Sequence, residues 1–301
     1  MTAFTDLGTL LETQNCKGRT IRCLLEMPVT GDHTAPLVVV APSYALSMRH
    51  FGPLSLFLTL NGFRALRFDY TNHVGVSDGD VYDYRLSTAA YDLRSVLGAL
   101  GTWGLQGPVG VISVSMGARI AFRALRDNPD VAALVSLVGV VNLQDTLKSV
   151  IGDDLVAEGL AGIVPADREV LGYQMSGRFV MDSIEHNLHS LDSTKGDVAQ
   201  CRFPITHVYA EEDAWTNLEE VESVFGEHLD NAPRQVYILP EACHKLEYNP
   251  VAARTAFSVA TSVVAQELTG AQLAVEEVVS PSFHNVVEKN RQEKSLDGDR
   301  I

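Results

Sequence analysis

Three side chains of this sequence have the types and the chain order needed to cleave an acyl bond through a covalent serine intermediate. Ser115 lies in the stretch SVSMG (113–117), where an apolar β-type run becomes a helical pattern. This stretch matches the nucleophile-elbow pattern G-x-S-x-G, with a serine in the first small position. Asp213 and His244 follow in the order in which an acid and a histidine follow the serine in such enzymes.

The elbow pattern favours Ser115 over Ser113 as the nucleophile. A sharp strand-to-helix turn strains the backbone of the nucleophile and requires small flanking residues. A motif centred on Ser113 would have the β-branched Val111 as a flank. The N–H of Met116, at the start of the new helix, is then the first expected donor to an acyl oxyanion. Taken alone, a serine at this place could simply cap the helix.

The placement of Asp213 and His244 strengthens the catalytic hypothesis. Asp213 follows the predicted strand ITHVYA (205–210), and His244 follows the predicted strand QVYILP (235–240). Because the carboxyl ends of parallel strands meet at one edge of a sheet, both side chains are expected near Ser115.

Other carboxylates and histidines are the alternatives to these two residues. Glu211 and Glu212 are near Asp213, but solvated loop charges are the expected role for them. His207 lies inside a predicted strand and is expected to be a core histidine. His73 is expected either to line the pocket or to hold a loop. Five further histidines have no strand-end placement relative to the acid: His50, His186, His189, His228 and His284.

The second oxyanion donor should come from the loop after the first parallel strand. This loop is APSYALSMRHF (41–51) and lacks the glycine that such loops often contain. The backbone N–H of Tyr44 is the first choice, with that of Ala45 next.

The candidate catalytic residues lie within a sequence that alternates between strand and helix patterns, and these elements must position them. Strands are predicted at 37–41, 63–69, 109–113, 133–140, 205–210 and 235–240, and helices near 50–61, 86–103, 116–127, 215–229 and 250–268. Near-continuous apolar strands between amphipathic segments indicate a mostly parallel, doubly wound α/β sheet. Before them, two antiparallel strands joined around Lys17 and Gly18 are expected at its edge. With the elbow, this pattern predicts an α/β-hydrolase fold.

Residues 1–301 are predicted to form one domain with an insertion. About sixty residues, 143–203, separate two strands, which is too long for a structureless loop and indicates a helical cap over the ligand-binding edge. Its apolar segment 155–165 is expected to wall a tunnel for an alkyl chain. The polar tail 281–301 is expected to bury little.

Composition excludes several classes of function. The formal charge is −15, which disfavours binding to nucleic acid or to anionic membranes. The N-terminus lacks a signal-peptide pattern and no apolar run is long enough to span a bilayer, so a cytoplasmic protein is expected. The four cysteines have no CxxC spacing, which argues against a zinc site or a disulfide framework. We expect neither a metal nor a cofactor.

The sequence also resembles a known family, the acyltransferases of luminous bacteria. The matching stretches are MRHFGPLSLFLTLNGFRALRFDYTNHVGVSDG, GVISVSMGARIAF, VGVVNLQDTL, LDSTKGDVAQ and YAEEDAWTNLEEV, within about residues 35–260. The resemblance implies an α/β-hydrolase-fold acyl-ACP thioesterase that passes fatty acyl groups to a fatty acid reductase complex. It places Ser115, Asp213 and His244 on the family's nucleophile, acid and histidine.

The sequence departs from the family's pattern at two places, neither of which changes the three candidate catalytic residues. Pro42-Ser43-Tyr44 stands where the family has Ser-Gly-Phe, and Ala214 stands where it has a second aspartate. The expected activity is cleavage of long-chain acyl thioesters carried by ACP or CoA. A general carboxylesterase, a thioesterase of another lipid or polyketide pathway, and a non-catalytic acyl-binding module remain the alternatives.

Overall fold

An eight-stranded, mostly parallel sheet forms the centre of the molecule. The computed structural model describes residues 8–226 and 232–295. The strand order is β1-β2-β4-β3-β5-β6-β9-β10. All neighbouring pairs from β4 to β10 are parallel, whereas β1 and β2 are antiparallel to their neighbours. The strands are β1 Thr9–Gln14, β2 Thr20–Glu26, β3 Leu37–Ala41, β4 Arg64–Phe68, β5 Val109–Val114, β6 Val131–Leu137, β9 Ile205–Ala210 and β10 Arg234–Leu239.

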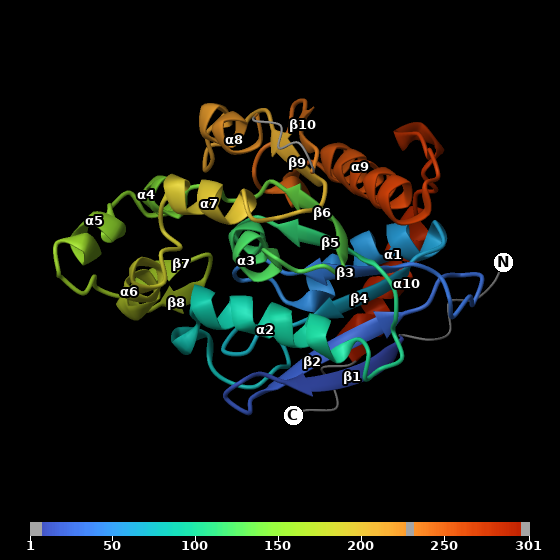
Figure 1. The fold of residues 1–301 in the computed structure, drawn as a ribbon, viewed down its shortest axis with the longest axis horizontal. Coiled ribbons are helices and arrows are strands. Elements are labelled where there is room, and N and C mark those ends of the chain that lie inside the picture. Colours follow the sequence, from blue (N-terminus) through green and yellow to red (C-terminus); the bar gives the residue numbers. More distant parts are fainter. Residues whose placement is uncertain (1–7, 227–231, 296–301) are drawn as a thin grey trace.

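Helices cover both faces of this sheet (Figure 1). On one face, α2 and α3 pack together, and on the other α9 packs on β5 and β6 beside α1. No helix within 8–226 and 232–295 is long and apolar enough to cross a membrane. The helices are α1 Gly52–Leu60, α2 Leu86–Ala99, α3 Met116–Leu125, α4 Leu143–Ile151, α5 Leu155–Leu160, α6 Gly177–Glu185, α7 Leu191–Val198, α8 Leu218–Phe225, α9 Pro250–Thr269 and α10 Phe283–Ser295, with short 3₁₀ helices at Met48–Phe51, Val81–Asp83, Leu246–Tyr248 and Val275–Glu277.

The apolar strands explain why the sheet is buried on both faces. Every residue of β3, β4 and β9 is buried, and successive side chains enter two separate apolar clusters, one on each face. The doubly wound architecture and the antiparallel pair at one edge are therefore confirmed, with Gly18 at positive φ between β1 and β2.

Some predicted bounds differ from those in the structure. The strand predicted at 133–140 is β6 and ends at Leu137, because Val138 has a φ of 44° that breaks the extended backbone. The apolar pattern extends beyond the end of the strand because Val140 and Val141 are also buried, although they lie outside β6. The helix predicted at 215–229 is α8, which begins after Asn217 caps it; residues 227–231 lie outside the described part.

The segment 143–203, which was predicted to be an insertion, contains α4 to α7 and a small antiparallel pair, β7 Arg168–Val170 with β8 Tyr173–Met175. Figure 1 shows α4, α5, α6, β7 and β8 gathered on the left of the sheet. Asp197 of α7 joins this segment to the helix that follows Ser115. Its carboxylate accepts hydrogen bonds from Arg119, Arg123 and Arg126, at distances of 2.8 to 3.2 Å.

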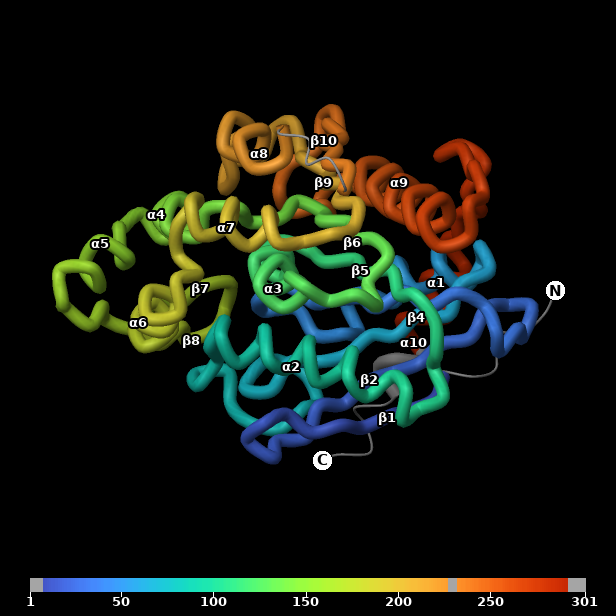
Figure 2. Tube along the Cα trace, viewed as in Figure 1, coloured from blue at the N-terminus to red at the C-terminus, as the bar shows by residue number. Residues whose placement is uncertain are grey.

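The segment 281–301, expected to bury little, contains α10. Figure 2 shows this red helix behind the blue strand β2. Lys289 is only 7% exposed and pairs with the buried carboxylate of Glu26, which also accepts from Arg67 at 2.7 Å. Although burial works to raise the pKa of Glu26, the two cations hold that pKa below its ordinary value. The polar composition of this tail therefore did not predict that Lys289 forms a buried charge pair with Glu26.

Candidate active site

Ser115 sits at a strained turn between β5 and α3. Its backbone has φ 50° and ψ −122°, a conformation that L-residues rarely adopt. Neighbouring strands hold this turn, because the Ser115 N–H donates to Leu137 O at 2.9 Å and its carbonyl accepts from Val140 N at 3.0 Å. Gly117 is required here, since a Cβ would come within 2.5 Å of the Pro42 carbonyl oxygen. Ser115 thus has the elbow geometry predicted from SVSMG, whereas the fully buried Ser113 lies within β5.

The structure brings Ser115, His244 and Asp213 into one hydrogen-bonded chain. Ser115 Oγ lies 2.7 Å from His244 Nε2, and His244 Nδ1 lies 2.7 Å from Asp213 Oδ2. The three side chains come from the ends of β5, β9 and β10, as the strand-end argument anticipates. In this geometry a neutral imidazole with its proton on Nδ1 can accept the serine hydroxyl proton at Nε2.

Backbone donors hold Asp213 in the orientation that this chain needs. Asp213 Oδ1 accepts from Trp215 N at 2.8 Å and from Thr216 N at 3.1 Å, which leaves Oδ2 for His244. Burial works to raise the Asp213 pKa, but His244 and the nearby donors outweigh it and hold the pKa below its ordinary value. The ring centroids of Trp215 and His244 lie 4.5 Å apart, so the indole packs against the imidazole. Asp213 is therefore a fixed, ionised partner for the imidazole.

The alternative carboxylates and His207 lie elsewhere. Glu211 and Glu212 are both exposed, and the Glu211 carboxylate accepts from Glu241 N at 3.1 Å. His207 is fully buried within β9 and stacks on Phe225 at 4.9 Å. Burial lowers the His207 pKa to about 3, so the ring is neutral at physiological pH. His228 lies outside the described residues.

Hydrogen bonding distinguishes the two candidates for the second oxyanion donor. The N–H of Ala45 already donates to His73 Nε2 at 3.1 Å. Within the described part of the chain, the N–H groups of Tyr44 and Met116 have no acceptor. The Pro42 carbonyl packs against Gly117, so the loop that contains Tyr44 runs beside the start of α3. Tyr44 and Met116 remain the candidate donors, and the geometry disfavours Ala45.

The sequence did not predict how the loop after β3 is held. Asp69 accepts from Met48 N at 2.6 Å and from Val76 N at 2.9 Å, and Arg67 donates to Met48 O at 2.7 Å. Burial raises the Asp69 pKa to about 6. A buried aspartate at the end of a strand, followed by the glycine-containing stretch 72–79, was the available sequence signal. The contacts themselves join residues 7 to 21 positions apart and have no periodicity that could reveal them.

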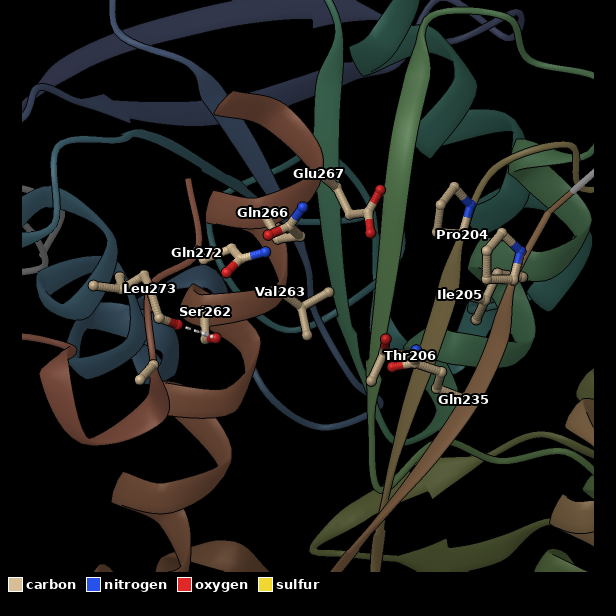
Figure 3. Close-up of a pocket in the computed structure, with 12 residues that line it drawn as sticks. Pro204, Ile205, Thr206, Gln235, Ser262, Val263, Gln266, Glu267, Gln272 and Leu273 are labelled. Atoms are coloured by element: carbon tan, nitrogen blue, oxygen red, sulfur yellow. Dashed lines mark hydrogen bonds between the residues drawn. The ribbon is translucent and has the colours of Figure 1, made fainter. Parts of the chain in front are cut away.

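A hollow of about 430 Å³ lies at the opposite end of β9 and β10 (Figure 3). It is lined by Ile205 and Gln235, from the beginnings of these strands, and by Glu267 near the end of α9. Asp213 and His244 follow the other ends of the same two strands. This hollow is therefore not part of the Ser115 site. Within the described ranges, no group of three or more His, Cys, Asp or Glu side chains could hold a metal ion.

Comparison with known proteins places this chain in a family. A model of the family described as acyl transferase matches residues 17–299. The chain belongs to the acyl transferase family. An acyl transferase of Aliivibrio fischeri is 31% identical over 98% of this chain and 94% of its own length, and one of Vibrio harveyi is 31% identical over 86% and 84%. The resemblance inferred from the sequence is thereby confirmed.

Solved structures show the same fold with much lower sequence identity. Est1E from Butyrivibrio proteoclasticus, solved with ferulic acid bound, has a TM-score of 0.69 at 17% identity and covers 85% of this acyl transferase family member and 98% of its own chain. The Pyrococcus furiosus esterase Pf2001 has a TM-score of 0.65 at 17% identity, over 86% and 91%. The α/β-hydrolase fold is therefore confirmed.

Proposed function

We propose that this acyl transferase family member cleaves long-chain fatty acyl thioesters, carried by acyl carrier protein or CoA, through an acyl-Ser115 intermediate. The observation that carries the proposal is the hydrogen-bonded chain from Ser115 through His244 to Asp213, with 2.7 Å at both steps. Family membership supports acyl transfer as the reaction class. The thioester substrate rests on the resemblance described above.

In the first half-reaction, Ser115 Oγ attacks the thioester carbonyl carbon while His244 Nε2 takes the hydroxyl proton. Asp213 stabilises the imidazolium that forms and keeps its proton on Nδ1. The N–H groups of Tyr44 and Met116 would bind the oxyanion of the tetrahedral intermediate. As the intermediate collapses, the C–S bond breaks, and the imidazolium gives its proton to the leaving thiolate.

In the second half-reaction, water or another acceptor attacks the acyl-serine ester. His244 takes a proton from the acceptor and returns one to Ser115 Oγ as the C–O bond to the enzyme breaks. With water the product is a free fatty acid. A fatty acid reductase complex is the acceptor that the family resemblance implies. The chemistry at Ser115 needs neither a metal nor a cofactor.

The insertion 143–203 is the proposed site of chain-length selection. Leu155 and Val156 of α5 are buried, and we assign them to the proposed wall for an alkyl chain. Leu160, Ile163 and Val164 are 57% to 61% exposed, which restricts the proposed wall within 155–165 to its first residues. Each methylene buried in such a tunnel contributes about 0.8 kcal/mol. Turnover should rise with acyl length and fall beyond the end of the tunnel.

The test combines intact-protein mass spectrometry with a substrate series. Wild type, Ser115→Ala and the matched control Ser113→Ala are mixed with acyl-ACP and acyl-CoA of graded length, with and without glycerol as an acceptor. We expect a transient acyl adduct on wild type and on Ser113→Ala, and none on Ser115→Ala. An adduct that persists on Ser115→Ala would refute the nucleophile assignment.

The same series separates the alternatives. A flat profile across short and long chains, with oxygen esters cleaved as well as thioesters, would indicate a general carboxylesterase. A preference for functionalised acyl groups would indicate a thioesterase of another lipid or polyketide pathway. If a fluorophosphonate also failed to label Ser115, the chain would be a non-catalytic acyl-binding module.

A further inference from the structure

His73 contacts the loop that contains Tyr44 through one hydrogen bond and one ring contact. Its Nε2 accepts the N–H of Ala45 at 3.1 Å, and the imidazole is only 4% exposed. The ring packs 5.9 Å from the Tyr44 ring and 4.6 Å from the Tyr84 ring. Aromatic packing therefore helps to hold the acceptor in place.

The Ala45 backbone needs such a partner. Its φ is 64°, in the left-handed region that alanine rarely adopts. The loop has no glycine that could adopt this conformation without strain. A strained backbone conformation persists only where surrounding contacts hold it. The hydrogen bond from the Ala45 N–H to His73 is such a contact.

The protonation state of His73 suits this role. A backbone N–H can donate only to an unprotonated ring nitrogen, so the ring must be neutral with its proton on Nδ1. Burial lowers the His73 pKa to about 4, which keeps the ring neutral at physiological pH. An arginine or lysine at this position could not accept the same N–H.

The neighbouring peptide explains why this contact matters for the reaction. The Tyr44 N–H has no acceptor within the described part of the chain and precedes the fixed Ala45 peptide. We propose that His73 is a positioning residue that fixes the loop backbone so that the Tyr44 N–H can bind the acyl oxyanion. This inference rests on the proposed function, and it assigns to the 72–79 loop a part in the acyl transfer step.

The test uses two substitutions of His73 and one control. His73→Phe keeps a ring but removes the acceptor, whereas His73→Gln places an amide oxygen near the position of Nε2. Tyr84→Phe is the matched control, because the buried Tyr84 hydroxyl has no hydrogen-bond partner in the described structure and its ring stays in the cluster. Thermal unfolding of all four proteins identifies any variant that fails to fold.

Three measurements are made on each folded protein. The first is kcat and KM for a long-chain p-nitrophenyl ester, and the second is the affinity for an alkylboronic acid, which forms a tetrahedral adduct with the serine. The third is hydrogen exchange in the peptide that spans residues 42–48. Loss of one oxyanion donor costs about 10²- to 10³-fold in kcat, so a misplaced donor should cost about 10- to 100-fold.

We expect His73→Phe to lower kcat and boronate affinity together by that factor, with KM within about threefold and faster exchange in 42–48. His73→Gln should recover most of the loss, and Tyr84→Phe should match wild type. Unchanged exchange in His73→Phe would overturn the inference. Faster exchange with unchanged kcat and boronate affinity would also overturn it, because His73 would then be only structural.

The outcomes distinguish this inference from the proposed function. If wild type cleaves no thioester but binds the boronate in a His73-dependent way, the proposed substrate fails and the inference stands. If wild type cleaves thioesters and His73→Phe does so equally well, the inference fails alone.

Discussion

Replacing Asp213 with asparagine should abolish most of the acylation rate for a reason that the local hydrogen bonds define. Asp213 Oδ1 accepts two backbone N–H groups, those of Trp215 and Thr216. An amide nitrogen cannot take that place, so the asparagine must keep its oxygen there and turn its NH₂ group toward His244 Nδ1. The imidazole would then carry its proton on Nε2, which could no longer accept from Ser115.

The loss of rate in Asp213→Asn should be large because it places the His244 proton on the wrong ring nitrogen. In a serine protease, replacing the aspartate of the triad with asparagine lowers kcat by about 10⁴-fold, which corresponds to about 5.5 kcal/mol in the activation barrier. We expect a loss of that order here, because Asp213 Oδ2 lies 2.7 Å from His244 Nδ1 and the side chain is fully buried. Glu211→Gln and Glu212→Gln are the controls and should keep most activity, since both side chains are exposed.

The assay is single-turnover acylation and deacylation at neutral pH, with thermal unfolding to show that each variant folds. Asp213→Asn should be slow in both half-reactions, since both need an acceptor at Nε2. A near-wild-type rate in Asp213→Asn, together with a collapse in either glutamate variant, would refute the assignment and transfer the role of the acid to that glutamate.

Three further predictions concern buried polar groups. Ser113→Ala should change the free energy of unfolding by less than about 1 kcal/mol in urea titrations, because the buried Ser113 hydroxyl has no partner in the described structure. Asp197→Asn should lower that free energy by about 3 to 5 kcal/mol, because Arg119, which is fully buried, would lose its counter-charge; a loss below 1 kcal/mol would contradict this. The pKa of His207 is about 3 in the folded protein and near 6.5 in the unfolded chain, so the unfolded chain binds more protons and stability falls as pH drops below 6.5. Between pH 7 and pH 5, His207 should cost about 2 kcal/mol, and His207→Phe should remove that part of the acid sensitivity in urea titrations at the two pH values.

The fold and the proximity of the three candidate site residues could be predicted because each depends on a local pattern. β3, β5 and β9 are short apolar runs. Ser115, Asp213 and His244 each lie within five residues after the end of a strand. Parallel strands bring those ends to one edge whatever the rest of the chain does.

The remaining features depend on contacts between distant segments, for which the sequence has no repeating signal. Examples are the pairing of Asp197 with three arginines, the hydrogen bond from Ala45 to His73, and the packing of α10 through Lys289. Lys289 illustrates the difficulty. Its neighbours are polar, so composition favours a solvated tail, yet its ammonium group neutralises a carboxylate 263 residues earlier in the chain.

That pairing has a consequence for how the protein is made. Chains emerge from the ribosome N-terminus first at about 5 to 20 residues per second, so Glu26 is synthesised roughly 13 to 50 s before Lys289. Arg67 is synthesised only 41 residues after Glu26, so for most of that interval it is available to the carboxylate whereas Lys289 is not. The strand β2 therefore acquires its full charge compensation only after α10 has been synthesised. Nascent chains halted before α10 should be more accessible to proteases at β2 than the released protein.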